Sequence, residues 1–102
     1  DHAARSFARN EPEIRKLPEL PSEYVRECIR FTPFCFEDVG WLIEQAGPEL
    51  FLFSTDYPHV EGGRRPFERF EKSLGDRSEA ARQRFYADNF VDLMGTAVAA
   101  MV

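Results

Sequence analysis

The sequence lacks the features that mark nucleic-acid-binding, membrane and secreted proteins. Its 102 residues carry 13 Lys and Arg against 18 Asp and Glu, a formal net charge of −5, whereas nucleic acids and anionic membranes bind clustered positive charge. No run approaches the ~18 apolar residues of a membrane-spanning helix, and the first residues lack the charged start and apolar middle of a signal peptide. We therefore expect a cytoplasmic protein without nucleic-acid or membrane partners.

Cysteine and glycine motifs are also scarce. Cys28 and Cys35 are the only two cysteines, and their spacing matches neither a CxxC redox pair nor a zinc ribbon, so we expect both to be small buried residues in a reducing compartment. No phosphate-binding loop or dinucleotide-binding fingerprint occurs. Ser54 lies outside any Gly-x-Ser-x-Gly elbow, which leaves nucleophilic serine chemistry unsupported.

Phenylalanine, by contrast, is abundant: ten residues are Phe, and 43% of the chain is hydrophobic. This composition favours a packed globular structure. We expect its apolar faces to be too large for so short a chain to cover by itself. The length allows one domain at most, because a complete eight-stranded α/β barrel needs roughly 250 residues. The chain begins without Met and opens with helical composition, so we expect a piece of a longer protein.

The most informative stretch is residues 50–59, in which Leu-Phe-Leu-Phe runs into Ser-Thr-Asp-Tyr-Pro-His. A continuous apolar run predicts a strand that is buried on both faces, as in parallel sheets, and Pro58 ends it. Asp56 and His59 would then project from the carboxyl end of a strand. Open α/β sheets and α/β barrels both bind their ligands at that end.

The rest of the pattern predicts three regions. Residues 1–22 read as a helix end followed by a Pro-rich loop. Residues 23–60 read as a βαβ unit with parallel strands near 27–34 and 50–54. The helix between them has acidic residues suited to its start, Glu37 and Asp38, and Gly47-Pro48 stops it. Residues 61–102 read as C-terminal helices, of which one starts at Pro66 and the last is capped by Ser78 and Gly95 and has Tyr86, Phe90, Leu93 and Met94 on its apolar face.

Four side chains could carry chemistry. Asp56 could bind a divalent metal or act as a general base, or it could cap the following turn as an Asx residue. His59 could be a ligand, a proton carrier or a hydrogen-bonded structural residue. Arg64 and Arg65 could clamp a substrate carboxylate, or they could form a solvated loop.

Residues 53–59, followed by Glu61-Gly62-Gly63-Arg64 and Pro66, resemble the last strand and loop of the amidohydrolase-2 family, and Asp88-Asn89-Phe90 to Met94-Gly95 resembles its final helix. These are metal-dependent hydrolases and decarboxylases. The resemblance covers about residues 22–95. It implies an α/β fold made of the last two strand-helix units of a (β/α)8 barrel, with parallel strands and flanking helices.

The resemblance also implies a site. Asp56 would bind the metal, usually zinc, and help to handle the proton of the metal-bound water, with His59 and Arg64 near a small carboxylated or cyclic substrate. The rest of the barrel would be a partner of this segment, and the uncovered edges predict self-association into a homo-oligomer. Hydrolysis and decarboxylation both remain open.

The chain departs from the family in its histidines. The first-strand His-x-His pair and the mid-barrel histidine are absent, since only His2 and His59 occur. A catalytic zinc takes three protein ligands, so we predict that this chain is inactive by itself. Two alternatives stay open: a non-catalytic α/β interaction or regulatory module without metal, and a small complete enzyme that uses Asp56 and His59 as an acid-base pair.

Overall fold

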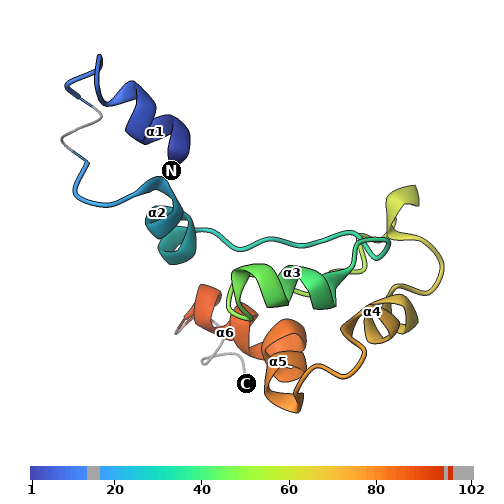
Figure 1. Ribbon diagram of the computed structural model, residues 1–102. Helices are drawn as coiled ribbons and strands as arrows, with labels where there is room; N and C mark the ends of the chain where they lie inside the picture. The colour runs from blue at the N-terminus through green and yellow to red at the C-terminus, as the bar shows by residue number, and fades with distance from the viewer. Residues whose placement is uncertain (14–16, 96, 98–102) are drawn as a thin grey trace.

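The computed structural model describes residues 1–13, 17–95 and 97, and this part of the chain is helical (Figure 1). Its elements are α1 (His2–Phe7), α2 (Pro21–Cys28), α3 (Val39–Ala46), the 3-10 helix η2 (Val60–Gly62), α4 (Pro66–Leu74), α5 (Glu79–Gln83), the π-helix η3 (Arg84–Asp88) and α6 (Asn89–Met94). None of these helices is long and apolar enough to cross a membrane.

The predicted α/β fold, with the last two parallel strand-helix units of a barrel, is wrong. No strand or sheet forms in the described ranges, and the two segments expected to be strands share a single isolated bridge between Phe31 and Phe51. The bridge is parallel, with the Phe31 amide donating to the Leu50 carbonyl and the Leu52 amide donating to the Phe31 carbonyl, each at 2.8 Å. Pairing in the predicted direction therefore exists, but it stops after one residue.

The pairing does not extend because helical groups take the hydrogen bonds that a neighbouring strand would make. The Phe53 amide donates to the Phe85 carbonyl at 2.9 Å. The Asn89 side-chain amide donates to the carbonyls of Phe51 at 2.9 Å and Pro48 at 2.6 Å. In an α-helix the Asn89 amide would donate to the Phe85 carbonyl. In η3 it donates to the Arg84 carbonyl instead, so the Phe85 carbonyl can accept from outside the helix.

The first predicted strand fails for a different reason, because residues 27 and 28 belong to α2. Pro21 lies at the start of that helix, where its missing amide costs nothing. Glu23 accepts a hydrogen bond from the Leu20 amide at 2.6 Å and secures the same end. Cys28, at the last turn, is exposed, whereas Cys35 is buried, so the expectation that both cysteines are buried holds only for Cys35.

The predicted helix boundaries that depend on capping residues are confirmed. Asp38 caps α3 by accepting from the Trp41 amide at 2.9 Å. Pro66 begins α4, and Ser78 caps α5 by accepting from the Ala81 amide at 3.2 Å. Gly95 ends α6 with a φ of 57°, a conformation that favours glycine.

The apolar face predicted for the last helix is confirmed at Tyr86, which packs against the core, and is wrong at Phe90, Leu93 and Met94. Phe90, Leu93 and Met94 are each nearly half exposed, at 46–48%, and the buried positions are Ala81, Phe85 and Asn89. The prediction assumed an unbroken α-helix, whereas η3 inserts a wider turn and shifts the inward face of α6.

An aromatic cluster forms the core. The Phe53 ring lies 5.6 Å from Phe70 and 6.1 Å from Phe85, both edge to face, and Phe70 to Phe85 is 5.1 Å. Edge-to-face pairs at this separation stabilise beyond the area that they bury. The other buried members of the cluster are Cys35, Val39, Ile43, Leu50, Phe51, Leu74 and Ala81.

Tyr86 closes one side of the core with a polar contact. Its hydroxyl donates to Glu71 at 2.8 Å, and Arg82 donates to the same carboxylate at 2.6 Å. Burial, the hydrogen bond to Glu71 and the charge of Glu71 all raise the pKa of Tyr86, in that order.

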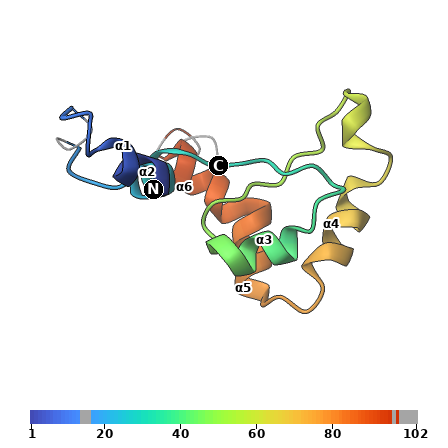
Figure 2. The ribbon, with the colours of Figure 1, turned by 45° about the horizontal axis from the view of Figure 1, so that its top comes forward.

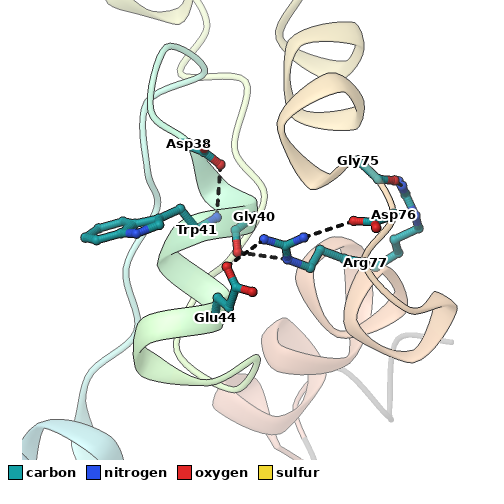
Figure 3. A network of polar contacts seen from close by, with 8 residues as sticks. Asp38, Gly40, Trp41, Glu44, Gly75, Asp76 and Arg77 are labelled. Atoms are coloured by element: carbon teal, nitrogen blue, oxygen red, sulfur yellow. Dashed lines mark hydrogen bonds and ion pairs between the residues drawn. The ribbon is translucent and has the colours of Figure 1, made fainter.

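Hydrogen bonds from Arg77 connect the turn after α4 to α3 (Figure 3). Arg77 donates to the Gly40 carbonyl at 3.1 Å, to Glu44 at 2.9 Å and to Asp76 at 3.1 Å. A Cβ at Gly40 would lie 2.2 Å from the Ser73 carbonyl oxygen, so only glycine permits this approach of α3 and α4.

The molecule is elongated rather than spherical, with dimensions of 48 × 33 × 29 Å. Its radius of gyration is 16.8 Å, against about 13 Å for a compact domain of this length. The helix α1 lies apart from the group formed by α3 to α6 (Figure 1), and neither α1 nor α2 contains a buried residue. The loop around η2 projects from the opposite end (Figure 2).

Candidate functional site

Asp56 lies in a tight turn at the end of the extended segment that starts at Leu50. The Ser54 hydroxyl accepts from the Asp56 amide at 3.2 Å, and the Asp56 carbonyl accepts from the His59 amide at 2.8 Å. Asp56 has a φ of 55°, which makes it the one non-glycine residue with positive φ in the described part of the chain. Backbone strain of this kind persists where the surroundings fix it, and it clusters at functional sites.

The η2 helix folds back onto this turn. A Cβ at Gly62 would lie 2.3 Å from the Thr55 carbonyl oxygen and 3.3 Å from the Cβ of Asp56. The buried Cys35 thiol donates to the Gly62 carbonyl at 3.3 Å, which ties η2 to the segment before α3. The backbone around Asp56 is therefore held from two directions.

Asp56 lines a cleft of about 290 Å³, which we call the Asp56 cleft; it is also lined by Thr32, Pro33, Phe34, Ser54, His59 and Glu61. The Asp56 side chain is half-buried and, among the described residues, its carboxylate accepts no hydrogen bond. It does not cap the turn as an Asx residue, and the hydroxyl of Ser54 serves that purpose instead. The carboxylate is left facing the cleft, where a carboxylate without partners can bind a cation or accept a proton.

The structure brings some of the predicted residues together and separates others. His59 and Asp56 share the Asp56 cleft. Arg64 lies outside it and lines an adjoining cavity of about 420 Å³, which His59 also lines. Arg65 pairs with Glu68 at 3.2 Å on the exposed start of α4.

The sequence patterns assigned no chemical role to the other five residues of the cleft, which are Thr32, Pro33, Phe34, Ser54 and Glu61. Glu61 is separated from His59 by one residue and is followed by two glycines. That position in a short loop is the sequence feature that could have indicated its place in the cleft. Asn89, the buried polar residue that supports the segment before Asp56, was noticed only as part of a resemblance. The Asn89 side chain points into the interior because the π-helix η3 precedes it, and no sequence pattern indicated that π-helix.

A metal does not fit this chain by itself. In the ranges that the structure describes, no three His, Cys, Asp or Glu side chains gather closely enough to hold an ion. A catalytic zinc takes three protein ligands and keeps one position open. Asp56 can supply one ligand at most. His59 is exposed, and adding it to Asp56 still does not give the three ligands that a zinc site needs.

Comparison with solved structures shows a similarity to an amidohydrolase. The chain superposes on part of an amidohydrolase from Mycobacterium avium subsp. paratuberculosis K-10 with a TM-score of 0.73 and 30% sequence identity. The match covers 92% of this chain and 24% of that protein, so the chain spans about a quarter of the length of the amidohydrolase it resembles. No family model and no curated protein matches the chain.

Proposed function

We propose that this chain is a portion of a metal-dependent amidohydrolase-like enzyme that hydrolyses or decarboxylates a small carboxylated or cyclic substrate. The observation that carries the proposal is the Asp56 carboxylate, half-buried at a cleft wall, without a hydrogen-bond donor and mounted on a strained turn. The similarity to a portion of an amidohydrolase supports the same enzyme class.

In this proposal Asp56 accepts a proton from water or returns one to the substrate, and His59 exchanges protons from the same cleft. Arg64 binds a substrate carboxylate in the adjoining cavity. The metal, which we propose to be zinc, would need ligands from outside this chain. We accordingly propose that the 102-residue chain is inactive by itself.

Two measurements test the proposal. Calorimetric titration of the 102-residue chain with zinc should detect no tight stoichiometric binding, because the ligands are incomplete. The full-length gene product should contain a divalent metal by elemental analysis and should turn over simple carboxylated amides, lactones or aromatic carboxylic acids. A full-length product without metal and without turnover would overturn the proposal.

The Asp56→Asn variant of the full-length product isolates the role of the carboxylate. Asn tolerates positive φ as Asp does, so the fold should be retained while activity falls about 10²- to 10⁴-fold. Glu61→Gln is the matched control, since it neutralises another carboxylate of the same cleft and should change activity less than about tenfold. Equal losses in the two variants would contradict the assignment of Asp56.

The second candidate is a non-catalytic interaction or regulatory module. Two observations favour it: the absence of a metal-ligand group among the described residues, and large exposed apolar side chains such as Trp41 at 54% and Phe36 at 63%. The accessible surface of 7612 Å² exceeds the about 5,900 Å² of a compact monomer of this mass, which supports association with a partner or with a second copy. An inactive, metal-free full-length product that binds a partner would establish this candidate.

A further inference from the structure

A cavity of about 460 Å³ beside α4 is lined by Arg64, Arg65, Glu68, Arg69 and Lys72, and we call it the basic cavity. Four of its five side chains are cations, in a chain whose net charge is −5. Its single carboxylate, Glu68, already pairs with Arg65 at 3.2 Å. The cavity is separate from the Asp56 cleft and plays no part in the proton transfers proposed above.

The other three cations of the cavity have no carboxylate partner. Arg77, Arg82 and Arg84 each form an ion pair, whereas in the described part of the chain Arg64, Arg69 and Lys72 form none. Two acids, Glu37 and Asp38, line the neighbouring cavity that Arg69 and Lys72 also border. Both are engaged by backbone amides, Glu37 by that of Phe34 at 2.7 Å and Asp38 by that of Trp41 at 2.9 Å.

Arg69 is also held in place before any ligand arrives. Its guanidinium carbon lies 4.6 Å from the centre of the Phe36 ring, a cation–π contact that restrains the side chain. Lys72 follows three residues later on the same helix, where two like charges repel each other. A restrained guanidinium beside an ammonium that forms no ion pair among the described residues is a favourable site for a planar or tetrahedral oxyanion.

We propose that the basic cavity binds an oxyanion, a carboxylate or a phosphate group, through Arg69 and Lys72, with Arg64 at its border. Arg64 lines both this cavity and the cavity that His59 lines, and His59 in turn lines the Asp56 cleft, so the three sites are neighbours. The anion can therefore be the charged end of an extended ligand or a free anion. Neither case depends on metal binding or catalysis, so the proposal can be tested even if the enzymatic one fails.

The test is titration of the ¹⁵N-labelled 102-residue chain with inorganic phosphate at constant ionic strength, followed by NMR. Saturable shifts confined to residues 64–72 are expected, and the double variant Arg69→Gln/Lys72→Gln should weaken binding at least tenfold. The matched control is Arg5→Gln, because Arg5 lines a cavity of similar size, about 410 Å³, together with Glu19 and Glu23. This control should bind phosphate like the parent.

A second titration with glutarate distinguishes the source of the anion. Shifts at residues 64–72 together with residues 56–59 would indicate the charged end of an extended ligand, and shifts at 64–72 alone would indicate a free anion. Equal binding by the parent and by the double variant would overturn the proposal. Shifts that chloride reproduces at the same ionic strength would overturn it as well. A melting curve for each variant serves as the control that the variant is folded.

Discussion

The two ends of this molecule are both helical, yet they are held together by different forces. The helical body, α3 to α6, encloses Val39, Phe70 and Leu74 at 0% exposure. The N-terminal arm consists of α1 and α2, which have six and eight residues and contain no buried residue. Isolated helices of that length are marginal in water, so a helix assignment carries no information about how strongly the segment is held.

The arm relies on polar contacts at its surface. Asp1 accepts from the Ser22 amide at 2.9 Å and from the Ser22 hydroxyl at 2.6 Å, which joins the start of α1 to α2. Arg26 donates to the Ala46 carbonyl at 2.7 Å and links α2 to α3. Such exposed contacts contribute little each, so the body should unfold cooperatively while the arm opens at much lower free energy.

The largest contrast should come from phenylalanines. Phe85→Ala in the body empties a site that is 1% exposed and should lower the free energy of unfolding by about 3–5 kcal/mol. Phe7→Ala in the arm, where the side chain is 61% exposed, should change it by less than about 0.5 kcal/mol. Urea denaturation followed by circular dichroism measures both, and similar losses would refute the division of the molecule into body and arm.

A smaller contrast should separate two asparagines. Asn89→Leu leaves the buried Phe51 carbonyl and the partly buried Pro48 carbonyl without their donor and should cost about 1–3 kcal/mol. Asn10→Leu, on the exposed surface of the arm, should be close to neutral. The same denaturation experiment applies, and a neutral Asn89→Leu would show that the two hydrogen bonds do not hold the segment before Asp56.

Tyr86 should make the body sensitive to alkaline pH. Its folded pKa is raised above the ordinary value, so the protonated phenol stabilises the folded state below about pH 10, and this stability is lost as the pH rises above that value. Tyr86→Phe should cost about 1 kcal/mol at neutral pH through the lost bond to Glu71. The variant should also show a weaker decline of melting temperature above pH 10 than the parent, and parallel declines would contradict the role of Tyr86.

The smallest effect should appear in the arm. Ser22→Ala removes one exposed hydrogen bond to Asp1 and should alter global stability by less than about 0.5 kcal/mol. The backbone amides of α1 should nevertheless exchange with solvent faster, because the contact orders that helix locally. Hydrogen exchange by mass spectrometry measures this, and a shift of the global unfolding midpoint would instead mean that the arm and the body unfold together.

Sequence patterns predicted those parts of the fold that depend on neighbouring residues. Asp38 and Ser78 accept from backbone amides of the first turn that follows them, and Pro66 fixes its own backbone angle where a missing amide costs nothing. All three mark helix starts in the structure. The strand expected at 50–54 depended on a partner elsewhere. Its Phe53 amide is paired with Phe85, thirty-two positions away, and an apolar run cannot reveal whether a strand or a helix supplies that carbonyl.

The same limit applies to the candidate site. The proximity of Asp56 and His59 follows from a tight turn of four residues, which sequence could indicate. Thr32 and Phe34 reach the cleft through the Phe31–Phe51 bridge, a contact between distant segments. The stacking of Arg69 on Phe36 likewise joins segments more than thirty residues apart and had no signal in the local pattern.

The π-helix η3 gives the last part of the chain a phase that a regular helix would not have. If residues 84–88 became α-helical with no change of length, α5 and α6 would merge into a continuous α-helix and everything after the turn would rotate by about 100°, the angle of one α-helical residue. Asn89 would turn out of the interior, and Phe90, which is now exposed, would be redirected. A change of helix type in this one turn would thus be felt at Asp56, although no residue of the Asp56 cleft had been altered.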